Sequence, residues 1–209
     1  MIQSRPDAVR HRSLAFFDAQ FQRQVAAREL ALNVFERRAL PYLGGRVLDL
    51  GCGLGNLSVA AALRGCEVLA VDGSPTAIEH VRNEARRRDV LVQAEQADLA
   101  TWSIAGEYDA IVSIGLLMFF PCRRARELME AIEEHVVAGG IAVINVLVEG
   151  TTFLDMFEPE GYCLLASGAV EEHFRGHGWQ IQSAMHAERF DAPQGTQKVF
   201  DTVIASKSA

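Results

Sequence analysis

The fold of this 209-residue chain is decided by Val47-Leu48-Asp49-Leu50-Gly51-Cys52-Gly53-Leu54-Gly55-Asn56. The first half of this stretch is short and apolar, which is typical of a parallel strand covered on both faces. The glycines allow a tight turn and a close approach to a ligand, because they carry no side chain. A helix expected from about residue 56 would direct its free N–H groups at the same point. The stretch therefore predicts a strand–turn–helix unit that binds a nucleotide-like ligand at the carboxyl edge of a sheet.

The spacing of the glycines indicates which ligand binds. A dinucleotide fingerprint needs G-x-G-x-x-G, and here Gly51 and Gly53 fit the first two positions but Asn56 occupies the third. Asp49 leads the turn, and its carboxylate would repel a pyrophosphate. We therefore expect a ligand with positive charge and no phosphate, such as S-adenosylmethionine with its ammonium and sulfonium groups. A structural glycine turn in another α/β protein is the alternative interpretation.

A second motif follows one strand later. The apolar run over residues 67–71 predicts a strand, and it ends in Asp72-Gly73-Ser74. Asp72 lies at the offset where an acidic residue accepts hydrogen bonds from ribose hydroxyls. It could instead be an acid at a helix N-terminus, but Ser74 and Pro75 already supply the cap and the first-turn proline.

Together these motifs resemble those of class I S-adenosylmethionine-dependent methyltransferases, over residues 46–146. The resemblance implies an α/β fold: a Rossmann-like seven-stranded sheet, mostly parallel with the last strand antiparallel, and helices on both faces. It implies that Asp98 accepts a hydrogen bond from the adenine amino group and that Leu99 supplies a backbone contact. The expected cofactor-binding residues are Asp49, Gly51, Cys52, Gly53, Asn56, Asp72, Gly73, Ser74, Asp98, Leu99, Ser113 and Ile114.

Within this class, residues 17–21, 108–123 and 199–207 and the strand after Gly139-Gly140 resemble the tellurite-resistance, TehB-like methyltransferases. That family methylates oxyanions or related forms of tellurium and selenium, and some members act on small thiol-like or halide acceptors. The resemblance places a His and Arg cluster for the anionic acceptor in the C-terminal hairpin, and this chain matches that pattern only loosely. The candidate acceptor-binding residues are Phe17, Phe21, Met118, Phe119, His186 and Arg189, and all could instead be core or surface residues.

The length of the chain and the pattern of its expected elements predict how many domains it has. At 209 residues we expect a single domain, with an N-terminal helical cover over residues 1–43 and a sheet core over 44–209. A helical pattern runs from residue 13 to residue 40. Two strands over 179–185 and 198–206 should form an antiparallel hairpin at the sheet edge.

The composition indicates which classes of binding partner are expected. A net charge of −7 argues against a large nucleic-acid footprint. No apolar run is long enough to span a membrane, and the polar N-terminus lacks the features of a secretory signal, so we expect a cytoplasmic monomer or homodimer with a small-molecule substrate. The four cysteines form no C-x-x-C pair and no zinc spacing with histidine, so we expect reduced thiols and no metal: Cys52, Cys66, Cys122 and Cys163.

The expected reaction is in-line methyl transfer that yields S-adenosylhomocysteine, in which the protein supplies proximity and orientation. A soft, ionised acceptor needs no general base, so no catalytic residue is nominated. Ser113-Ile114-Gly115-Leu116 replaces the Asn/Asp-Pro-Pro-aromatic motif of base and amide methyltransferases, which disfavours nitrogen of those kinds as the acceptor. Four alternatives stay open: a non-catalytic S-adenosylmethionine sensor, a methyltransferase for another small metabolite, a nicotinamide-dependent oxidoreductase and a nucleic-acid methyltransferase.

Overall fold

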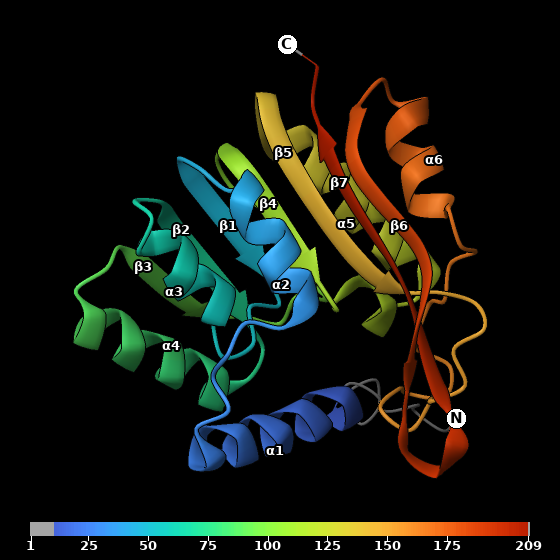
Figure 1. Cartoon of the computed structure of the whole chain (residues 1–209), viewed down its shortest axis with the longest axis horizontal. Coiled ribbons are helices and arrows are strands. Elements are labelled where there is room, and N and C mark those ends of the chain that lie inside the picture. The colour runs from blue at the N-terminus through green and yellow to red at the C-terminus, as the bar shows by residue number, and fades with distance from the viewer. Residues whose placement is uncertain (1–10, 209) are drawn as a thin grey trace, which may run out of the picture.

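The computed structural model describes residues 11–208, and its centre is one seven-stranded sheet in the order β3-β2-β1-β4-β5-β7-β6 (Figure 1). Strands β1 to β5 pair in parallel, and β7 pairs antiparallel with both β5 and β6. This is the predicted sheet, mostly parallel with the last strand antiparallel. The strands are β1 (Arg46–Leu50), β2 (Glu67–Asp72), β3 (Val92–Gln96), β4 (Tyr108–Ile114), β5 (Val136–Leu147), β6 (Gln180–Asp191) and β7 (Gln197–Ser206).

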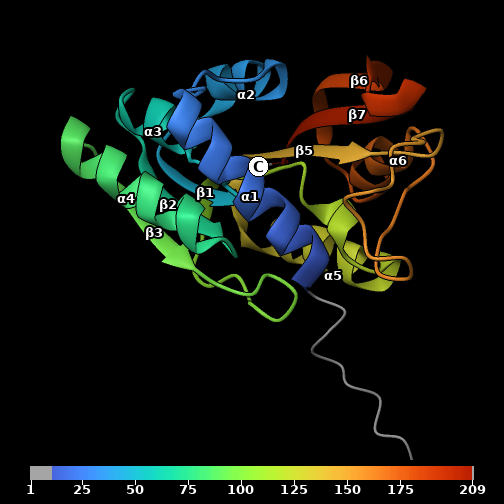
Figure 2. The same cartoon turned by 90° about the horizontal axis from the view of Figure 1, so that it is seen from below.

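Helices cover both faces of the sheet, as predicted. On one face pack α2 (Val34–Ala39), α3 (Asn56–Ala62) and α4 (Pro75–Arg88), and on the other pack α5 (Cys122–His135) and α6 (Ala169–Gly176). The remaining helix, α1 (His11–Ala27), crosses below the carboxyl ends of the strands (Figure 2). Short 3-10 turns complete the chain: η2 (Leu40–Tyr42), η3 (Leu117–Phe119) and η4 (Pro193–Gly195).

Local sequence explains where the helices begin. The Ser74 hydroxyl accepts a hydrogen bond from the backbone N–H of Ala77 at 3.0 Å, and Pro75 follows in the first turn of α4. The apolar side chains of α5 recur at helical spacing and are buried against the sheet at Leu128 and Ile132. The largest hydrophobic cluster therefore lies between the sheet and the α5–α6 side.

The helical pattern predicted over residues 13–40 is two helices and not one. Arg28, just after α1, has a left-handed backbone with φ of +56°. A new helix, α2, begins after its N-cap residue Asn33. The Asn33 side chain accepts hydrogen bonds from the N–H groups of Phe35 and Glu36, while the Glu36 carboxylate accepts one from the Asn33 N–H. This reciprocal capping box starts α2 as a new helix. The first ten residues of the predicted N-terminal cover lie outside the described residues.

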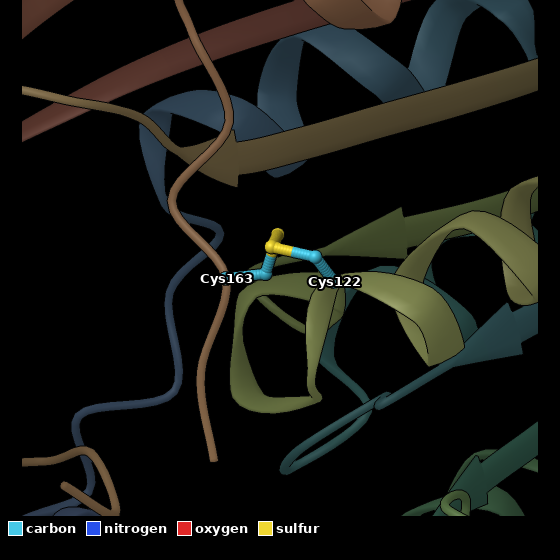
Figure 3. The surroundings of a disulfide bond; sticks show 2 residues. All are labelled: Cys122 and Cys163. Atoms are coloured by element: carbon cyan, nitrogen blue, oxygen red, sulfur yellow. A yellow bond between two sulfur atoms is a disulfide. The ribbon is translucent and has the colours of Figure 1, made fainter. Parts of the chain in front are cut away.

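The expectation of four reduced thiols is wrong for one pair. Cys122, at the start of α5, forms a disulfide with Cys163, 41 residues later (Figure 3). The segment between β5 and α6 folds back over the start of α5, where the Cys163 N–H donates to the Met118 carbonyl at 3.0 Å. Cys52 and Cys66 are free and buried. In the described part of the chain, no helix has the length and apolar character needed to cross a membrane.

Candidate functional site

A cavity of about 1190 Å³ opens at the carboxyl edge of the parallel strands, beneath α1. Among the predicted acceptor residues, Phe17, Phe21, Met118 and Phe119 line it. The buried hydroxyl of Ser113 and the cap residue Ser74 lie outside the lining. The predicted cofactor residues that line the cavity are Asp49, Gly51, Cys52, Gly53, Asn56, Asp72, Gly73, Asp98, Leu99 and Ile114.

The glycine turn between β1 and α3 forms the floor of the cavity. Gly51 and Gly53 have φ of +69° and +51°, in the left-handed region that favours glycine. The Gly51 N–H donates to the Val71 carbonyl at 2.8 Å, which fastens the turn to the end of β2. A Cβ atom at Gly53 would lie 3.2 Å from the Phe21 ring, so α1 rests directly on the turn.

Asp72 connects the ends of β1 and β2. Its Oδ2 accepts a hydrogen bond from the Gly53 N–H at 2.9 Å, and its Oδ1 accepts one from the Ser74 N–H at 2.8 Å. Burial raises the pKa of this carboxyl, against the lowering by the hydrogen bonds from Ser74 and Gly53. A carboxylate has about four lone-pair sites, so both oxygens can still accept bonds from a vicinal diol in the cavity.

Asp49 is a second buried carboxyl at the cavity, only 5% exposed. The Ser58 hydroxyl of α3 donates to its Oδ2 at 2.6 Å. Burial raises the pKa of Asp49 to about 7, which the Ser58 hydrogen bond opposes and the charges of Glu36 and Asp72 increase. A cationic group in the cavity would stabilise the ionised form of this carboxyl.

Asp98 and Leu99 lie in the turn after β3, where the chain curls around the rim of the cavity. The Ala100 N–H donates to Asp98 Oδ1 at 3.0 Å, and the Trp102 N–H donates to the Asp98 carbonyl at 2.8 Å. The adjoining Ala97 N–H donates to the Asp72 carbonyl at 3.0 Å, so this turn is tied to the end of β2. The predicted adenine contact of Asp98 stays a prediction.

Helix α1 is fastened over the cavity at two points. Asp18 Oδ1 accepts hydrogen bonds from the Ser74 hydroxyl at 2.5 Å and from the Thr76 N–H at 3.4 Å. The Ser13 hydroxyl donates to the Met156 carbonyl at 2.9 Å. The helix therefore joins the start of α4 to the segment between β5 and α6, and its side chains line the cavity. Figure 2 shows α1 crossing the carboxyl ends of the strands.

Aromatic side chains form a second part of the cavity wall, which we call the aromatic wall. The Phe17 and Phe119 rings meet edge to face with centroids 5.0 Å apart, and both line the cavity. Phe157 packs behind Phe119 at 5.0 Å and stacks on Tyr162 at 4.7 Å. The wall thus collects residues from α1, η3 and the segment after β5, which are far apart in the sequence.

Among the other polar residues that line the cavity are Asn145, which sequence reasoning missed, and Lys198, which the sequence offered as a third hairpin cation beside His186 and Arg189. Asn145 is fully buried in β5, and its amide donates to the Thr202 hydroxyl at 2.9 Å, while its Oδ1 has no hydrogen-bond partner among residues 11–208. Lys198 of β7 lies over the Phe153 ring at 4.8 Å, and burial lowers its pKa. The signal for Asn145 was present, because it is the one polar residue in the apolar run 141–147.

The structure does not bring His186 or Arg189 to the cavity lining. His186 lies between Asp201 Oδ2 at 3.0 Å and Glu171 Oε2 at 2.6 Å. The Arg189 guanidinium donates to Gln197 Oε1 at 3.0 Å. Both side chains make contacts within the β6–β7 edge and α6, away from the cavity lining, and their role in acceptor binding stays a prediction.

The pattern of donors and acceptors fits S-adenosylmethionine. Two buried carboxyls at the glycine turn suit cationic and hydroxyl groups, and a Cβ at Gly53 would crowd the Phe21 ring. The orphaned Oδ1 of Asn145 adds a buried acceptor on the β5 side. These features suit a ligand that carries an ammonium group and a ribose and lacks phosphate.

Comparison with known proteins points the same way. A family described as "Methyltransferase domain" matches residues 47–140. The "Probable S-adenosyl-L-methionine-dependent methyltransferase TehB" of Haemophilus influenzae is 29% identical over 99 residues, which is 47% of this chain and 35% of that protein. The ribosomal protein L11 methyltransferase of Dechloromonas aromatica is 43% identical over 105 residues, 49% of this chain and 33% of that protein. The chain covers from 20% to 52% of the length of such curated relatives.

Solved structures share the fold. The crystal structure of TehB from Haemophilus influenzae superposes with a TM-score of 0.72 and 20% identity, over 85% of this chain and 63% of that one. The complex of DhpI with S-adenosylhomocysteine (SAH) superposes with a TM-score of 0.64 and 20% identity, over 96% of this chain and 97% of that one. At these identities the likeness establishes the fold alone.

Proposed function

We propose that this chain is a class I S-adenosylmethionine-dependent methyltransferase that transfers a methyl group to a small acceptor, because residues 47–140 match a methyltransferase domain and the fold is similar to that of TehB. The sulfonium supplies the methyl group when the cofactor is bound, and S-adenosylhomocysteine is the product. One observation carries the proposal: a single cavity joins the glycine turn and its buried carboxyls to an aromatic wall beneath α1.

The chain's own residues would hold the cofactor along the floor of the cavity. Asp72 would accept hydrogen bonds from the ribose hydroxyls while it keeps its bonds to Gly53 and Ser74. Asp49, ionised by a cation beside it, would balance the charge of the methionine end. Asp98 and Leu99 would meet the adenine at the rim. Fixing the donor in this way leaves proximity and orientation as the protein's main contribution to the rate.

The acceptor end favours a small, poorly hydrated nucleophile. Phe17, Met118 and Phe119 offer an apolar surface, which stabilises a soft acceptor such as a thiol or a tellurium or selenium species. Lys198 lines the cavity, and burial lowers its pKa. Its ammonium would take the role predicted for His186 and Arg189, which is to hold an anionic acceptor. Such an acceptor is nucleophilic when ionised and needs no general base. Another small metabolite of the same character remains the alternative acceptor.

A sensor that binds S-adenosylmethionine without turnover is the second candidate, because the same cofactor residues would serve it. Calorimetric titration with S-adenosylmethionine, S-adenosylhomocysteine and NAD tests the cofactor first. We expect both adenosyl ligands to bind and NAD not to bind, and binding of NAD alone would overturn the proposal. Methyl-labelled cofactor is then incubated with thiols, selenite, tellurite and small amines. Labelled product identifies the acceptor class, whereas cofactor binding without any product supports the sensor.

The cellular location and oligomeric state are part of the proposal to be tested. A cytoplasmic protein usually keeps its thiols reduced, whereas Cys122 and Cys163 form a disulfide, so the cytoplasmic location stays a prediction. Trapping the thiols with an alkylating reagent in intact cells reports which form exists there. Light scattering of the purified chain distinguishes the predicted monomer from the predicted homodimer.

A further inference from the structure

Three potential metal ligands converge on the side of the molecule opposite α2 and α3. Glu133 lies in the last turn of α5, His173 lies in α6, and His177 caps the end of α6. Residues four apart on a helix project from the same face, so α6 directs both imidazoles at the carboxylate of α5. None of the three residues lines the cavity described above. The cluster is therefore a separate feature from the methyl-transfer site.

The ligand atoms lie close to one another, and His177 and Glu133 are hydrogen-bonded without an ion. His173 Nε2 lies 3.4 Å from Glu133 Oε2, His177 Nδ1 lies 2.7 Å from the same oxygen, and one ligand atom from each residue lies within 4.8 Å of the others. Bonds of about 2.0–2.2 Å to zinc at tetrahedral angles separate the ligand atoms by about 3.4 Å. Small side-chain rotations would bring all three atoms to that spacing.

Two atoms of the cluster lack a partner in the described part of the chain. Glu133 Oε1 and His173 Nε2 are both inaccessible to solvent and accept or donate no hydrogen bond there. Buried polar atoms are nearly always paired, so an orphaned carboxylate oxygen and an orphaned ring nitrogen on two neighbouring residues call for a partner. A cation held by the Glu133 carboxylate would give His173 Nε2 that partner. His177 is 51% exposed, which leaves an open side where water can complete the coordination.

The surroundings define the kind of ion. Two imidazoles and one carboxylate suit zinc and the neighbouring divalent transition metals, and they do not suit calcium or magnesium, which take oxygen ligands. The nearby Lys207 ammonium donates to the backbone carbonyls of Glu133 and Val136 at 2.6 and 2.8 Å, so it leaves the Glu133 carboxylate to the imidazoles. Its positive charge would weaken the binding of a cation without occupying the site.

We infer that Glu133, His173 and His177 bind one divalent ion of the zinc class, and that this ion cross-links α5 to α6. The signal in the sequence is the pair of histidines at a spacing of four, His-Phe-Arg-Gly-His, which a search for cysteine pairs passes over. The site is independent of the proposed methyl transfer, because its residues and the cavity share no side chain.

The test uses the full chain without a histidine tag, stripped of metal by a chelator, with zinc chloride as the titrant. We expect one zinc ion per chain by calorimetry, and we expect His173→Ala and Glu133→Gln each to weaken binding at least tenfold. Glu134→Gln changes the exposed neighbouring acid, and His80→Ala removes a histidine from α4 on the other face, so both should bind zinc as the wild type does. Cobalt in place of zinc should give the intense visible absorption of a four-coordinate ion.

Two results would overturn the inference. One is the absence of zinc binding by the wild-type chain, and the other is equal zinc binding by the wild type and the Glu133→Gln/His173→Ala/His177→Ala variant. His177→Ala alters an exposed side chain, so it stays informative if changes at the other two positions impair folding. S-adenosylmethionine binding is measured on every variant and should be unchanged, so failure of the metal site and failure of the proposed activity are told apart.

Discussion

At the scale of single residues, Asp72 performs two tasks with one carboxylate. It holds the glycine turn through Gly53 and the start of α4 through Ser74, and it faces the cavity where a ribose would lie. The residue type could be predicted from the sequence because strand end, turn and offset are local properties. The hydrogen bond from the Gly53 N–H to Asp72 could not be predicted, because it depends on the pairing of β1 with β2.

The first prediction concerns Asp72→Ala. The change removes two charge-assisted hydrogen bonds to the ribose, each worth about 1.5–3 kcal/mol, so we expect S-adenosylmethionine to bind at least about a hundredfold more weakly. Calorimetric titration measures the dissociation constant. Glu67→Gln is the matched control, because Glu67 is an exposed acid at the opposite end of the same strand. Equal affinities for Asp72→Ala and the control would contradict the ribose assignment, and circular dichroism excludes a simple loss of fold.

Asp49 predicts a pH dependence of cofactor binding. Burial raises its pKa to about 7, so the free chain takes up a proton there as the pH falls below that value. A cationic ligand binds the ionised form, and the proton must then be released. We therefore expect the dissociation constant for S-adenosylmethionine to rise as the pH falls below about 7, by at most about tenfold per pH unit.

Titrations at about pH 6 and about pH 8 measure this effect. Asp49→Asn cannot ionise, so it should bind the cofactor weakly and with a flatter pH dependence than the wild type. The prediction fails if wild type and variant show the same slope, since another group would then carry the proton. The Ser58 hydroxyl provides a second comparison: its removal in Ser58→Ala should shift the transition to higher pH, because its hydrogen bond favours the ionised form.

At the scale of elements, polar side chains cap helices and connect neighbouring helices and strands through hydrogen bonds. Asp18 joins α1 to α4, Asn33 starts α2, and His186 joins β6 to α6 and β7. The cap of α4 at Ser74 was predictable, since its signal lies within four residues. The break after Arg28 and the contacts of His186 were not, because each depends on how the chain returns to distant elements.

His186 predicts how stability changes with pH. The hydrogen bond to Asp201, followed by the one to Glu171, raises the pKa of this imidazole. A raised pKa in the folded state contributes stability that is fully present below the unfolded value of about 6.5 and is lost as the pH rises through the folded value. We expect the free energy of unfolding to decline over that window, and His186→Gln to remove most of the decline.

Urea unfolding at several pH values between about 5 and about 9 measures this decline in the free energy of unfolding. Both acidic partners must stay ionised for the effect, so the range begins above their pKa values. His80→Gln is the control, because burial lowers the pKa of His80 and its contribution to stability therefore has the opposite sign. A wild-type decline that persists unchanged in His186→Gln would assign the effect to another residue.

At the scale of the whole molecule, the sheet and its cofactor edge were predictable and the acceptor end was not. Runs of apolar residues and glycine turns mark the strands and the glycine cradle, and a parallel sheet aligns all carboxyl ends at one edge. The seven-stranded sheet came from the family resemblance, and the structure adds the strand order. The aromatic wall instead combines Phe17, Phe119 and Phe157 from three distant segments. The disulfide that fastens this region also joins residues 41 apart, with no local signal.

That disulfide carries the last prediction. Cys122–Cys163 closes a loop that contains β5 and the segment behind the aromatic wall. The chain-entropy relation for a loop of this length gives about 4 kcal/mol of stabilisation, because the crosslink restricts the unfolded chain. Cys122→Ser/Cys163→Ser should lower the free energy of unfolding in urea by roughly 2–4 kcal/mol, and reduction of the wild type should have the same effect. The Cys52→Ser variant serves as the control for loss of a buried thiol, and it should not respond differently from wild type to a reductant. If reduction left the wild type's stability unchanged, the loop would be held by packing at Met118 and Phe157, and the crosslink would be dispensable for the acceptor end.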